Sequence, residues 1–403
     1  MKKILVLLLS SVLLVSVFTA CSVPTTSVDS TGNYDTTQQV AIDMSDLVLA
    51  KPESYSMLRR DYLTDKGKEI YDGLYDAALN FEEYVYVDKN NDFDFDTIFD
   101  KFNQIFSYYV LLDHPEIFWT EGGFEHAASY VNERNETVYT FPIVYGCQQS
   151  EIENLKSELD TQVNQMFSEI PDGSDYEKAL WVYEWIMEKT VYIDRPFLSL
   201  GQNLDYSIYN LFINGKSNCN GYSKALSYIL NKLSIPCTIA VGECDDGQLH
   251  AWNIIQLDDG CYHLDSTWDD RYNQYSLSDT IESYGHAYFC VNDNDIYKSR
   301  KLVDYFYAPK CKSDKYNYFI YNNLYFDSVN DETFDKAISF CVENSKNSVE
   351  LKFADQTLLS EAKNYMNNEN SNLFDLLQAR GYDFGLNVSY GVIDEMNVLY
   401  ICS

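Results

Sequence analysis

An abrupt change of hydrophobic periodicity constrains this chain more than any other feature. From Asn218 to Leu233 the apolar residues recur at the spacing of an amphipathic helix. Immediately afterwards, the stretches CTIAVGEC, HAWNIIQL and CYHLDSTW have the composition of β-strands, and the DDG between the last two predicts a hairpin. A helix followed by a meander of strands predicts an α+β core, with the helix packed on an antiparallel sheet.

A cysteine lies at the start of that helix. Asn218 is a good N-cap residue, which places Cys219 in the first helical turn. There the backbone N–H groups have no helical partners and the helix dipole is positive, so a thiol is readily converted to a thiolate. Cys219 is therefore a candidate nucleophile.

Two residues of the following strands could activate this thiol. A cysteine nucleophile needs a base, and the base is usually oriented by a carboxylate or carboxamide. His250 begins the segment HAWNII, and Asp265 lies fifteen residues later in YHLDSTWDD. The chain thus carries Cys, His and Asp in that order, on a helix and two successive strands.

The expected hairpin register does not by itself bring the last two residues together. If DDG forms a tight loop, Asp265 lies opposite Asn253 or Ile254, two pleats from His250 and roughly 13 Å along the strand at ~3.3 Å per residue. Direct contact then requires a looser loop, a bulge or strong strand shear.

Several segments together resemble the transglutaminase-like, papain-like superfamily of cysteine enzymes. The matching stretches are CNGYSKAL, LSIPC, HAWNII and DDGCYHLDSTWDD, within about residues 175 to 295. The resemblance implies that Cys219 is the nucleophile, His250 the general base and acid, and Asp265 the residue that orients the imidazole. Asn218 departs from the small apolar residue often found before the cysteine, which affects local packing more than the triad.

An oxyanion formed during acyl transfer needs two hydrogen-bond donors. The backbone N–H of Cys219 is the expected first donor. The resemblance implies a second donor from an upstream tryptophan or polar side chain, and both Trp185 and Gln202 remain candidates.

The N-terminus has the features of a targeting segment. Two lysines precede an apolar stretch that is too short for comfortable membrane spanning, which predicts a signal peptide over residues 1–20. The sequence VFTACS resembles the lipobox of bacterial lipoproteins, which implies lipidation of Cys21; secretion with cleavage near Ala20 is the alternative. We expect an exported protein, anchored to the cell membrane by lipid and facing outside the cytoplasm.

Charge and cysteine content exclude some functions. The formal net charge of −33 argues against nucleic-acid binding, which needs clustered basic residues. Eight cysteines remain beside Cys21 and Cys219, and both disulfides and buried thiols are compatible with that number. No CxxC knuckle is present, so we expect neither a metal site nor a cofactor.

The rest of the chain divides into segments around the predicted catalytic domain at 174–298. A flexible tether is predicted over 21–46, a mainly helical region over 47–173, and a small α+β domain over 299–403.

The combined interpretation is an amide-bond enzyme that forms a thioester with a protein or peptide. Hydrolysis is favoured because an exposed cleft admits water, and cross-linking by a transglutaminase is the alternative. A catalytically silent surface-binding module on the same fold is a further alternative. The substrate, the oligomeric state and the role of the C-terminal domain stay open.

Overall fold

A computed structural model describes most of the chain after residue 55. The described residues are 56–88, 95–120, 124, 128–131, 137–193, 204, 206–270, 284–303, 308–346, 348–368, 371–382 and 388–402. All of them belong to one compact unit. The predicted signal peptide, tether and lipidation site at Cys21 lie outside the described residues, as does Gln202.

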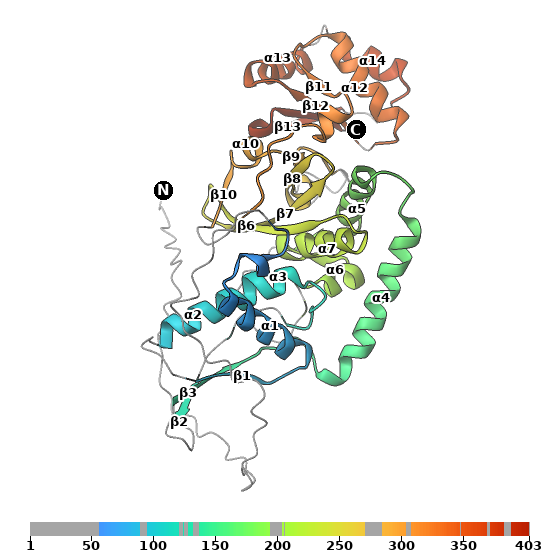
Figure 1. Cartoon of the computed structure of the whole chain (residues 1–403). Coiled ribbons are helices and arrows are strands. Elements are labelled where there is room, and N and C mark those ends of the chain that lie inside the picture. The colour runs from blue at the N-terminus through green and yellow to red at the C-terminus, as the bar shows by residue number, and fades with distance from the viewer. Residues whose placement is uncertain are drawn as a thin grey trace, which may run out of the picture. The chain divides into compact units, whose positions relative to one another are not determined.

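A five-stranded antiparallel sheet and one helix form the centre of the site-bearing region (Figure 1). The strand order is β10-β6-β7-β8-β9. The bounds are β6 (Cys237–Cys244), β7 (Leu249–Leu257), β8 (Gly260–Leu264), β9 (Phe289–Val291) and β10 (Arg300–Leu302). Helix α7 (Cys219–Lys232) packs on β6 and β7, which confirms the predicted α+β core. Strand β10 lies beyond the predicted boundary at residue 298 and still belongs to this sheet.

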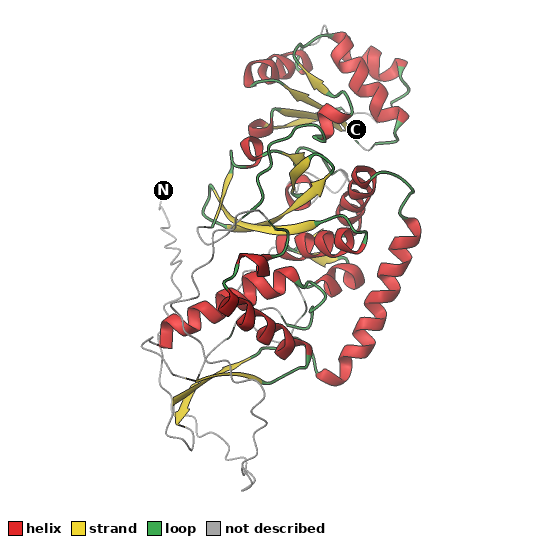
Figure 2. Ribbon diagram, viewed as in Figure 1, coloured by secondary structure: helices red, strands yellow, loops and turns green. Residues whose placement is uncertain are grey.

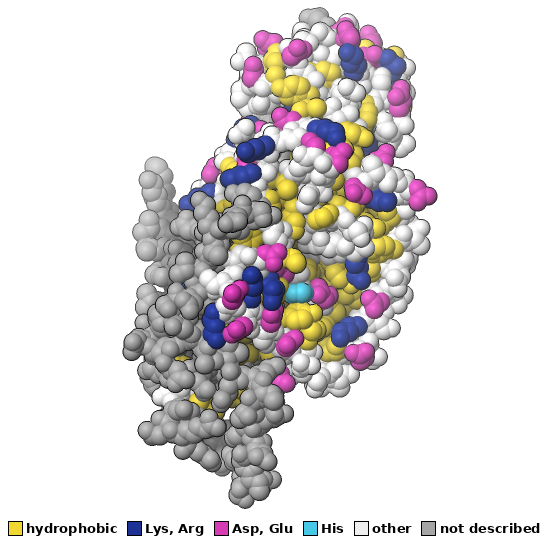
Figure 3. Space-filling view, viewed as in Figure 1, with side chains coloured by type: hydrophobic (Ala, Val, Ile, Leu, Met, Phe, Trp, Pro, Cys, Tyr) yellow, Lys and Arg dark blue, Asp and Glu magenta, His cyan; other side chains and the backbone are white. Residues whose placement is uncertain are grey.

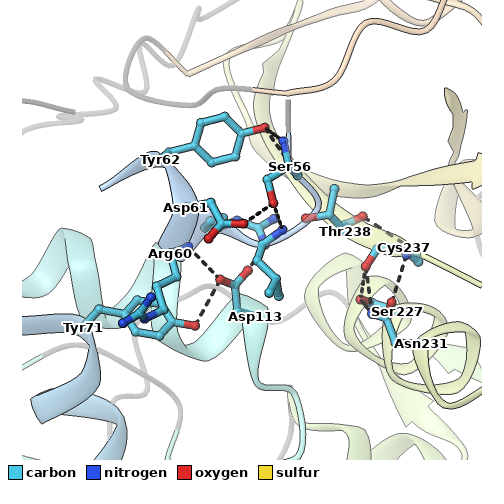
Figure 4. Close-up of polar contacts among 12 residues, drawn as sticks. Ser56, Arg60, Asp61, Tyr62, Tyr71, Asp113, Ser227, Asn231, Cys237 and Thr238 are labelled. Carbon is cyan, nitrogen blue, oxygen red and sulfur yellow. Dashed lines mark hydrogen bonds and ion pairs between the residues drawn. The ribbon is translucent and has the colours of Figure 1, made fainter. Parts of the chain in front are cut away.

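Local sequence explains how α7 begins and how it is tied to the sheet. The Asn218 side chain accepts hydrogen bonds from the N–H groups of Asn220 and Gly221, as expected of an N-cap. At the other end, the Asn231 side chain binds both the N–H and the carbonyl of Cys237, where β6 starts (Figure 4). The helix and the first strand are therefore fixed to each other by polar contacts as well as by packing.

Helices that precede and follow the segment from Cys219 to Asp265 complete the site-bearing region. They are α4 (Ile152–Glu169), α5 (Asp175–Lys189), α6 (Ile208–Asn214), α8 (Ser266–Asp269) and α10 (Asp293–Ile296), with the short pair β4 (Val191–Tyr192) and β5 (Lys216–Ser217). Ser174 and Glu177 form a capping box at the start of α5. A 3-10 turn over Gln149–Glu151 precedes α4, and Gln148 and Glu151 form a capping box at its start.

The N-terminal region is mainly helical, as predicted, with one small sheet. Its elements are a 3-10 turn (Arg59–Tyr62), α1 (Asp65–Leu79), β1 (Tyr84–Asp88), α2 (Phe95–Ile105), a π-helical turn (Phe106–Val110), α3 (Leu111–Asp113), β2 (Ala128–Val131) and β3 (Thr137–Pro142). The strands are ordered β1-β3-β2. A buried carboxylate, Asp113, joins three parts of this region: it accepts hydrogen bonds from Arg59, from the backbone of Arg60 and from Tyr71 (Figure 4).

The C-terminal region combines helices with a four-stranded sheet (Figure 2). The strand order is β11-β12-β14-β13. The bounds are α11 (Tyr318–Tyr321), β11 (Tyr325–Phe326), α12 (Asp331–Glu343), β12 (Val349–Phe353), α13 (Gln356–Met366), α14 (Leu373–Ala379), β13 (Ser389–Ile393), a 3-10 turn (Asp394–Met396) and β14 (Val398–Cys402). The expected α+β pattern is present.

Acidic and basic side chains are intermingled on the face drawn in Figure 3. Among the described residues, the structure contains no helix with the length and apolarity needed to cross a bilayer.

Candidate active site

Cys219 begins α7 and lies close to the packed interior. Its residue is 8% exposed, and its carbonyl accepts a hydrogen bond from the Ser223 hydroxyl. Gly221, two residues further on, is needed for close packing, because a Cβ at that position would overlap the Ser217 side chain. The helix start is therefore held tightly, and the sulfur has a defined position.

His250 lies at the second residue of β7, opposite Gly242 of β6. A Cβ on Gly242 would overlap the Trp252 ring and the Lys301 carbonyl, so this glycine lets the neighbouring strands and the indole approach. The imidazole is buried, and its Nε2 lies 2.8 Å from Asp265 Oδ2. Cys219 also interacts electrostatically with this ring and contributes to the raised pKa of His250.

Asp265 does not lie where the hairpin register predicted. The loop is tight, with Leu257 paired to Gly260, but β8 ends at Leu264, which pairs with Asn253. Asp265 instead caps helix α8, and its Oδ1 accepts the N–H of Trp268 at 3.1 Å. The expected separation of roughly 13 Å is wrong because the chain leaves the strand and turns at this residue. The expectation that the strand continues through residue 268 is wrong for the same reason.

The three side chains influence one another electrostatically. Burial disfavours the charged imidazole, but Asp265 and Cys219 outweigh it and raise the pKa of His250 to about 9. Burial also disfavours an ionised Asp265, yet the charges of His250 and Arg300 prevail and lower the pKa of this carboxyl. Near neutral pH the pair is therefore an imidazolium beside a carboxylate.

Comparison with known proteins gives the family of this segment. The profile of the transglutaminase-like superfamily matches residues 164–266. Residues 164–266 form a transglutaminase-like domain. The segment includes Cys219, His250 and Asp265, and no curated protein matches the chain significantly.

Three solved structures resemble parts of the chain. A TGase is 13% identical, with a TM-score of 0.25, over 49% of this chain and 54% of its own. A candidate cysteine protease from Cytophaga hutchinsonii is 15% identical, with a TM-score of 0.22, over 35% and 61%. A candidate protease from Parabacteroides distasonis ATCC 8503 is 12% identical, with a TM-score of 0.22, over 34% and 35%. The chain thus spans about half the length of the first of these structures.

Arg300 is a residue of this site that sequence reasoning missed. It lies outside the matched segment, on β10, and its side chain is fully buried with Nη1 bonded to Asp265 Oδ2. Its guanidinium stacks 3.8 Å from the ring centroid of Trp268, whose ring in turn lies 5.7 Å from the His250 ring. A single arginine thirty-five residues after the aspartate carries no recognisable motif.

The two aspartates that follow Trp268 anchor the transglutaminase-like domain internally. Asp269 accepts hydrogen bonds from the Tyr183 hydroxyl and the Tyr288 N–H, at 2.7 and 2.9 Å. Asp270 accepts one from the Tyr222 hydroxyl of α7 at 2.7 Å. These carboxylates tie α5 and α7 to the segment that carries Asp265.

The second oxyanion donor remains a prediction. Trp185 lies on α5 and is half-buried, with its ring 5.8 Å from that of Phe212 on α6. The other candidate, Gln202, lies outside the described residues.

One group of possible metal ligands occurs in the described part of the chain: His263, Asp293 and Cys311. The Trp252 indole N–H donates to His263 Nδ1 at 3.0 Å, and Nε2 faces Asp293 at 3.1 Å. A neutral imidazole that accepts at Nδ1 carries its proton on Nε2 and has no lone pair left for a metal. His263 is thus a satisfied core histidine.

None of the nine described cysteines is disulfide-bonded. Burial raises the pKa of Cys237 and Cys341 to about 12, and that of Cys147, Cys244 and Cys261 to about 11. Burial raises the pKa of Cys290 and Cys311 as well. These seven thiols are protonated near neutral pH and react slowly with alkylating agents.

Proposed function

We propose that the chain is a cysteine-dependent amide-bond enzyme, in which Cys219, His250 and Asp265 act as a catalytic triad through a thioester intermediate. One observation carries the proposal: the His250 ring binds the Asp265 carboxylate at 2.8 Å, and Cys219 also interacts with this ring and helps to raise its pKa. A nucleophile beside a base that a third group orients is the arrangement that acyl transfer requires.

The first half-reaction forms the thioester. The Cys219 thiolate attacks the carbonyl carbon of the amide, and a C–S bond forms as the carbonyl π electrons move to oxygen. The resulting oxyanion is met by the backbone N–H groups at the start of α7. The imidazolium of His250 then gives its proton to the leaving nitrogen, the C–N bond breaks, and an amine departs.

The second half-reaction regenerates the enzyme. His250, now neutral, removes a proton from a water molecule that attacks the thioester carbonyl. The C–S bond breaks, a carboxylic acid leaves, and the thiolate and imidazolium are restored. Because Nε2 is bound to Asp265, Nδ1 is the nitrogen left to exchange protons with sulfur, leaving group and water.

Hydrolysis is the preferred outcome over transfer to a lysine amine. The sequence predicted an exposed cleft, but Cys219 is only 8% and His250 only 7% exposed, so the preference has to rest on access to a largely enclosed site. The acyl donor must enter in either reaction, but the second step then needs only water in hydrolysis and a second protein side chain in cross-linking. Water reaches a largely enclosed thioester more easily.

The decisive experiment measures both reactivity and product. Wild type and the Cys219→Ala variant are incubated with iodoacetamide at pH 6, and the alkylated cysteine is located by mass spectrometry. The thiolate–imidazolium pair should make Cys219 react far faster than the protonated thiols. Reactivity no greater than that of an ordinary thiol would refute the triad and favour a silent binding module.

The acceptor is identified separately. Ammonia release from a glutamine-containing peptide is measured with and without monodansylcadaverine, with Cys219→Ala as the blank. Hydrolysis predicts ammonia release that does not need the amine and a glutamate product. Fluorescent amine incorporated into the peptide would assign cross-linking instead.

The proposal includes export and a lipid anchor at Cys21. The N-terminal lysines, the short apolar stretch and the sequence VFTACS support it. Cells that express the full chain are fed an alkyne-tagged fatty acid. The tag should appear on the wild type and be lost from Cys21→Ser; tagging of neither protein would contradict the anchor.

A further inference from the structure

Arg300 occupies an unusual position for a charged residue. It starts β10, the edge strand of the central sheet, where it pairs with Cys244 of β6. Its guanidinium is enclosed by three aromatic rings, with centroids at 3.8 Å (Trp268), 5.1 Å (Tyr288) and 5.5 Å (Trp252). A guanidinium with no exposed surface costs much free energy unless a carboxylate compensates it.

The compensating carboxylate is that of Asp265. Arg300 Nη1 binds its Oδ2, the same oxygen that binds His250 Nε2, while Oδ1 accepts the Trp268 N–H. The other nitrogens, Nε and Nη2, lie 3.4 Å from the Ser299 hydroxyl. Two fixed donors, one from β10 and one from α8, therefore hold the carboxylate, and the third donor is the imidazole.

We propose that Arg300 is a positioning residue of the triad, which holds the Asp265 carboxylate ionised and aimed at His250. The inference rests on the proposed function and adds a fourth member that the matched segment, ending at residue 266, does not contain. A carboxylate on a short loop could otherwise rotate away from the imidazole, and a displacement of about 1 Å can cost on the order of 10²-fold in rate.

Arg300 also balances charge in a buried site. When sulfur is a thiolate and the imidazole is protonated, Cys219, His250 and Asp265 together carry one negative charge, which Arg300 neutralises. The other titratable groups that interact with Asp265 or Arg300 come from four more segments: Tyr183 on α5, Cys244 on β6, His263 on β8 and Tyr288 before β9. Besides the His250 imidazolium, Arg300 is the cation bonded to this carboxylate oxygen, so its loss should act mainly through Asp265.

Two variants separate the charge of Arg300 from its shape. Arg300→Met removes the charge, so the pKa of Asp265 should rise. The acid limb, meaning the fall at low pH in the pH profiles of activity and of Cys219 alkylation, should then move up by about 1–3 pH units. Arg300→Lys keeps the charge without the planar fork. Its acid limb should stay near that of wild type, while kcat falls about 10- to 100-fold and KM changes little.

Arg59→Met is the matched control. Arg59 forms a second buried pair, with Asp113 at 2.8 Å, in the N-terminal region. Both substitutions break a buried arginine–aspartate pair and should raise the unfolding constant by a similar factor, on the order of 10² to 10³. Only Arg300→Met should move the acid limb. Equal pH profiles for folded Arg300→Met and wild type would overturn the inference.

A readout independent of catalysis distinguishes this inference from the proposed function. The folded-state pKa of Asp265 is depressed, so its stabilising contribution is present above the unfolded pKa of about 3.9 and is lost as pH falls through the folded value. The stability gap between wild type and Arg300→Met should therefore shrink below about pH 4, and it should shrink at neutral pH when Asp265→Asn is present in both.

The outcomes separate clearly. If the difference in stability between wild type and Arg300→Met is unaffected by pH and by Asp265→Asn, the link between Arg300 and Asp265 is refuted, whatever the protein catalyses. A wild type whose Cys219 is unreactive refutes the triad, and the positioning role falls with it. A reactive wild type with an unmoved acid limb in Arg300→Met refutes the positioning role alone.

Discussion

Two buried histidines of this protein have the same shifted pKa and different surroundings. His250 is bonded to one carboxylate, Asp265, and interacts electrostatically with a thiol, Cys219. His286 binds two carboxylates: Nδ1 lies 2.5 Å from Glu350 and Nε2 lies 2.8 Å from Glu184. The pKa of each imidazole is raised to about 9, because the carboxylates outweigh the effect of burial.

The surroundings of His286 are those of a structural clamp. Glu184 belongs to α5 and Glu350 to β12, so the imidazolium joins two elements that are far apart in sequence. The ring stacks on Tyr318 at 3.9 Å, and Lys346 adds a second cation to Glu184. Both ring nitrogens are occupied by carboxylates, so no nitrogen is available for chemistry.

The comparison teaches that a buried histidine–carboxylate pair with a raised pKa does not identify a catalytic base. The third partner does. A ring nitrogen that faces a thiol can pass its proton on, whereas one that faces a second carboxylate holds the proton as part of an ion pair. The following predictions test that distinction, from the largest expected effect to the smallest.

Removal of the nucleophile should have the largest effect. Cys219→Ala should lower kcat by on the order of 10⁶-fold, because no thioester can form. His286→Gln should leave kcat of the folded protein within about twofold at pH 7, since it touches no reacting atom. Peptide hydrolysis measured on both variants checks this, and a large kcat loss in His286→Gln would erase the distinction.

The same His286→Gln substitution should dominate stability. It leaves two buried carboxylates without their imidazolium, which should lower the free energy of unfolding by about 3–5 kcal/mol. Urea unfolding at pH 7 measures this, with Cys219→Ala as the comparison variant. If the alanine variant loses as much stability as the glutamine variant, the clamp has no special structural role.

Displacement of the thiol without removing it should have an intermediate effect. Gly221→Ala places a methyl group on the Ser217 side chain and should cost about 1–3 kcal/mol of stability, with slower Cys219 alkylation as the helix start shifts. Ser217→Ala in the same chain should recover part of both losses. Alkylation rates and thermal unfolding, measured together, test the prediction; an unchanged alkylation rate would mean that the sulfur is not precisely held.

A change of one pH unit above pH 9 should have the smallest effect on the rate. Above about pH 9 His250 loses the proton that it gives to the leaving amine, so kcat/KM should fall about tenfold per pH unit, or ~1.4 kcal/mol. His286→Gln should show the same limb, because His286 takes no part in the reaction. A limb that disappears in the His286→Gln variant would assign the titration to the clamp instead.

Stability at high pH, unlike the rate, should depend on His286. A folded pKa of about 9 lies above the unfolded value of about 6.5 for both histidines, so their stabilisation is complete below pH 6.5 and is lost as pH rises through 9. His286→Gln should reduce this alkaline loss. Unfolding curves between pH 6 and 10 provide the measurement, and an unchanged loss would show that His286 does not contribute.

Much of the central region could be predicted from patterns among neighbouring residues in the sequence. Asn218 marks the helix start because an amide oxygen can satisfy free backbone N–H groups within two residues. The strand stretches at 237–244 and 250–257 agree with β6 and β7, because a short run rich in apolar and β-branched residues and bounded by turn residues is a property of neighbouring residues. The order of Cys219, His250 and Asp265 is likewise visible in the linear chain.

Tertiary structure alone decided what these residues touch. Strand β8 stops at Leu264 and Asp265 turns into a helix cap, a change of direction that no periodicity records, and this turn brings the carboxylate to His250. Arg300 reaches the same oxygen from an edge strand, and His286 meets Glu350 across sixty-four residues. Short-range hydrogen bonding and periodicity depend on residues that are neighbours in the sequence, so they can be predicted from it. Charge pairing inside a core depends on distances in space, which are set only when the chain has folded and packed.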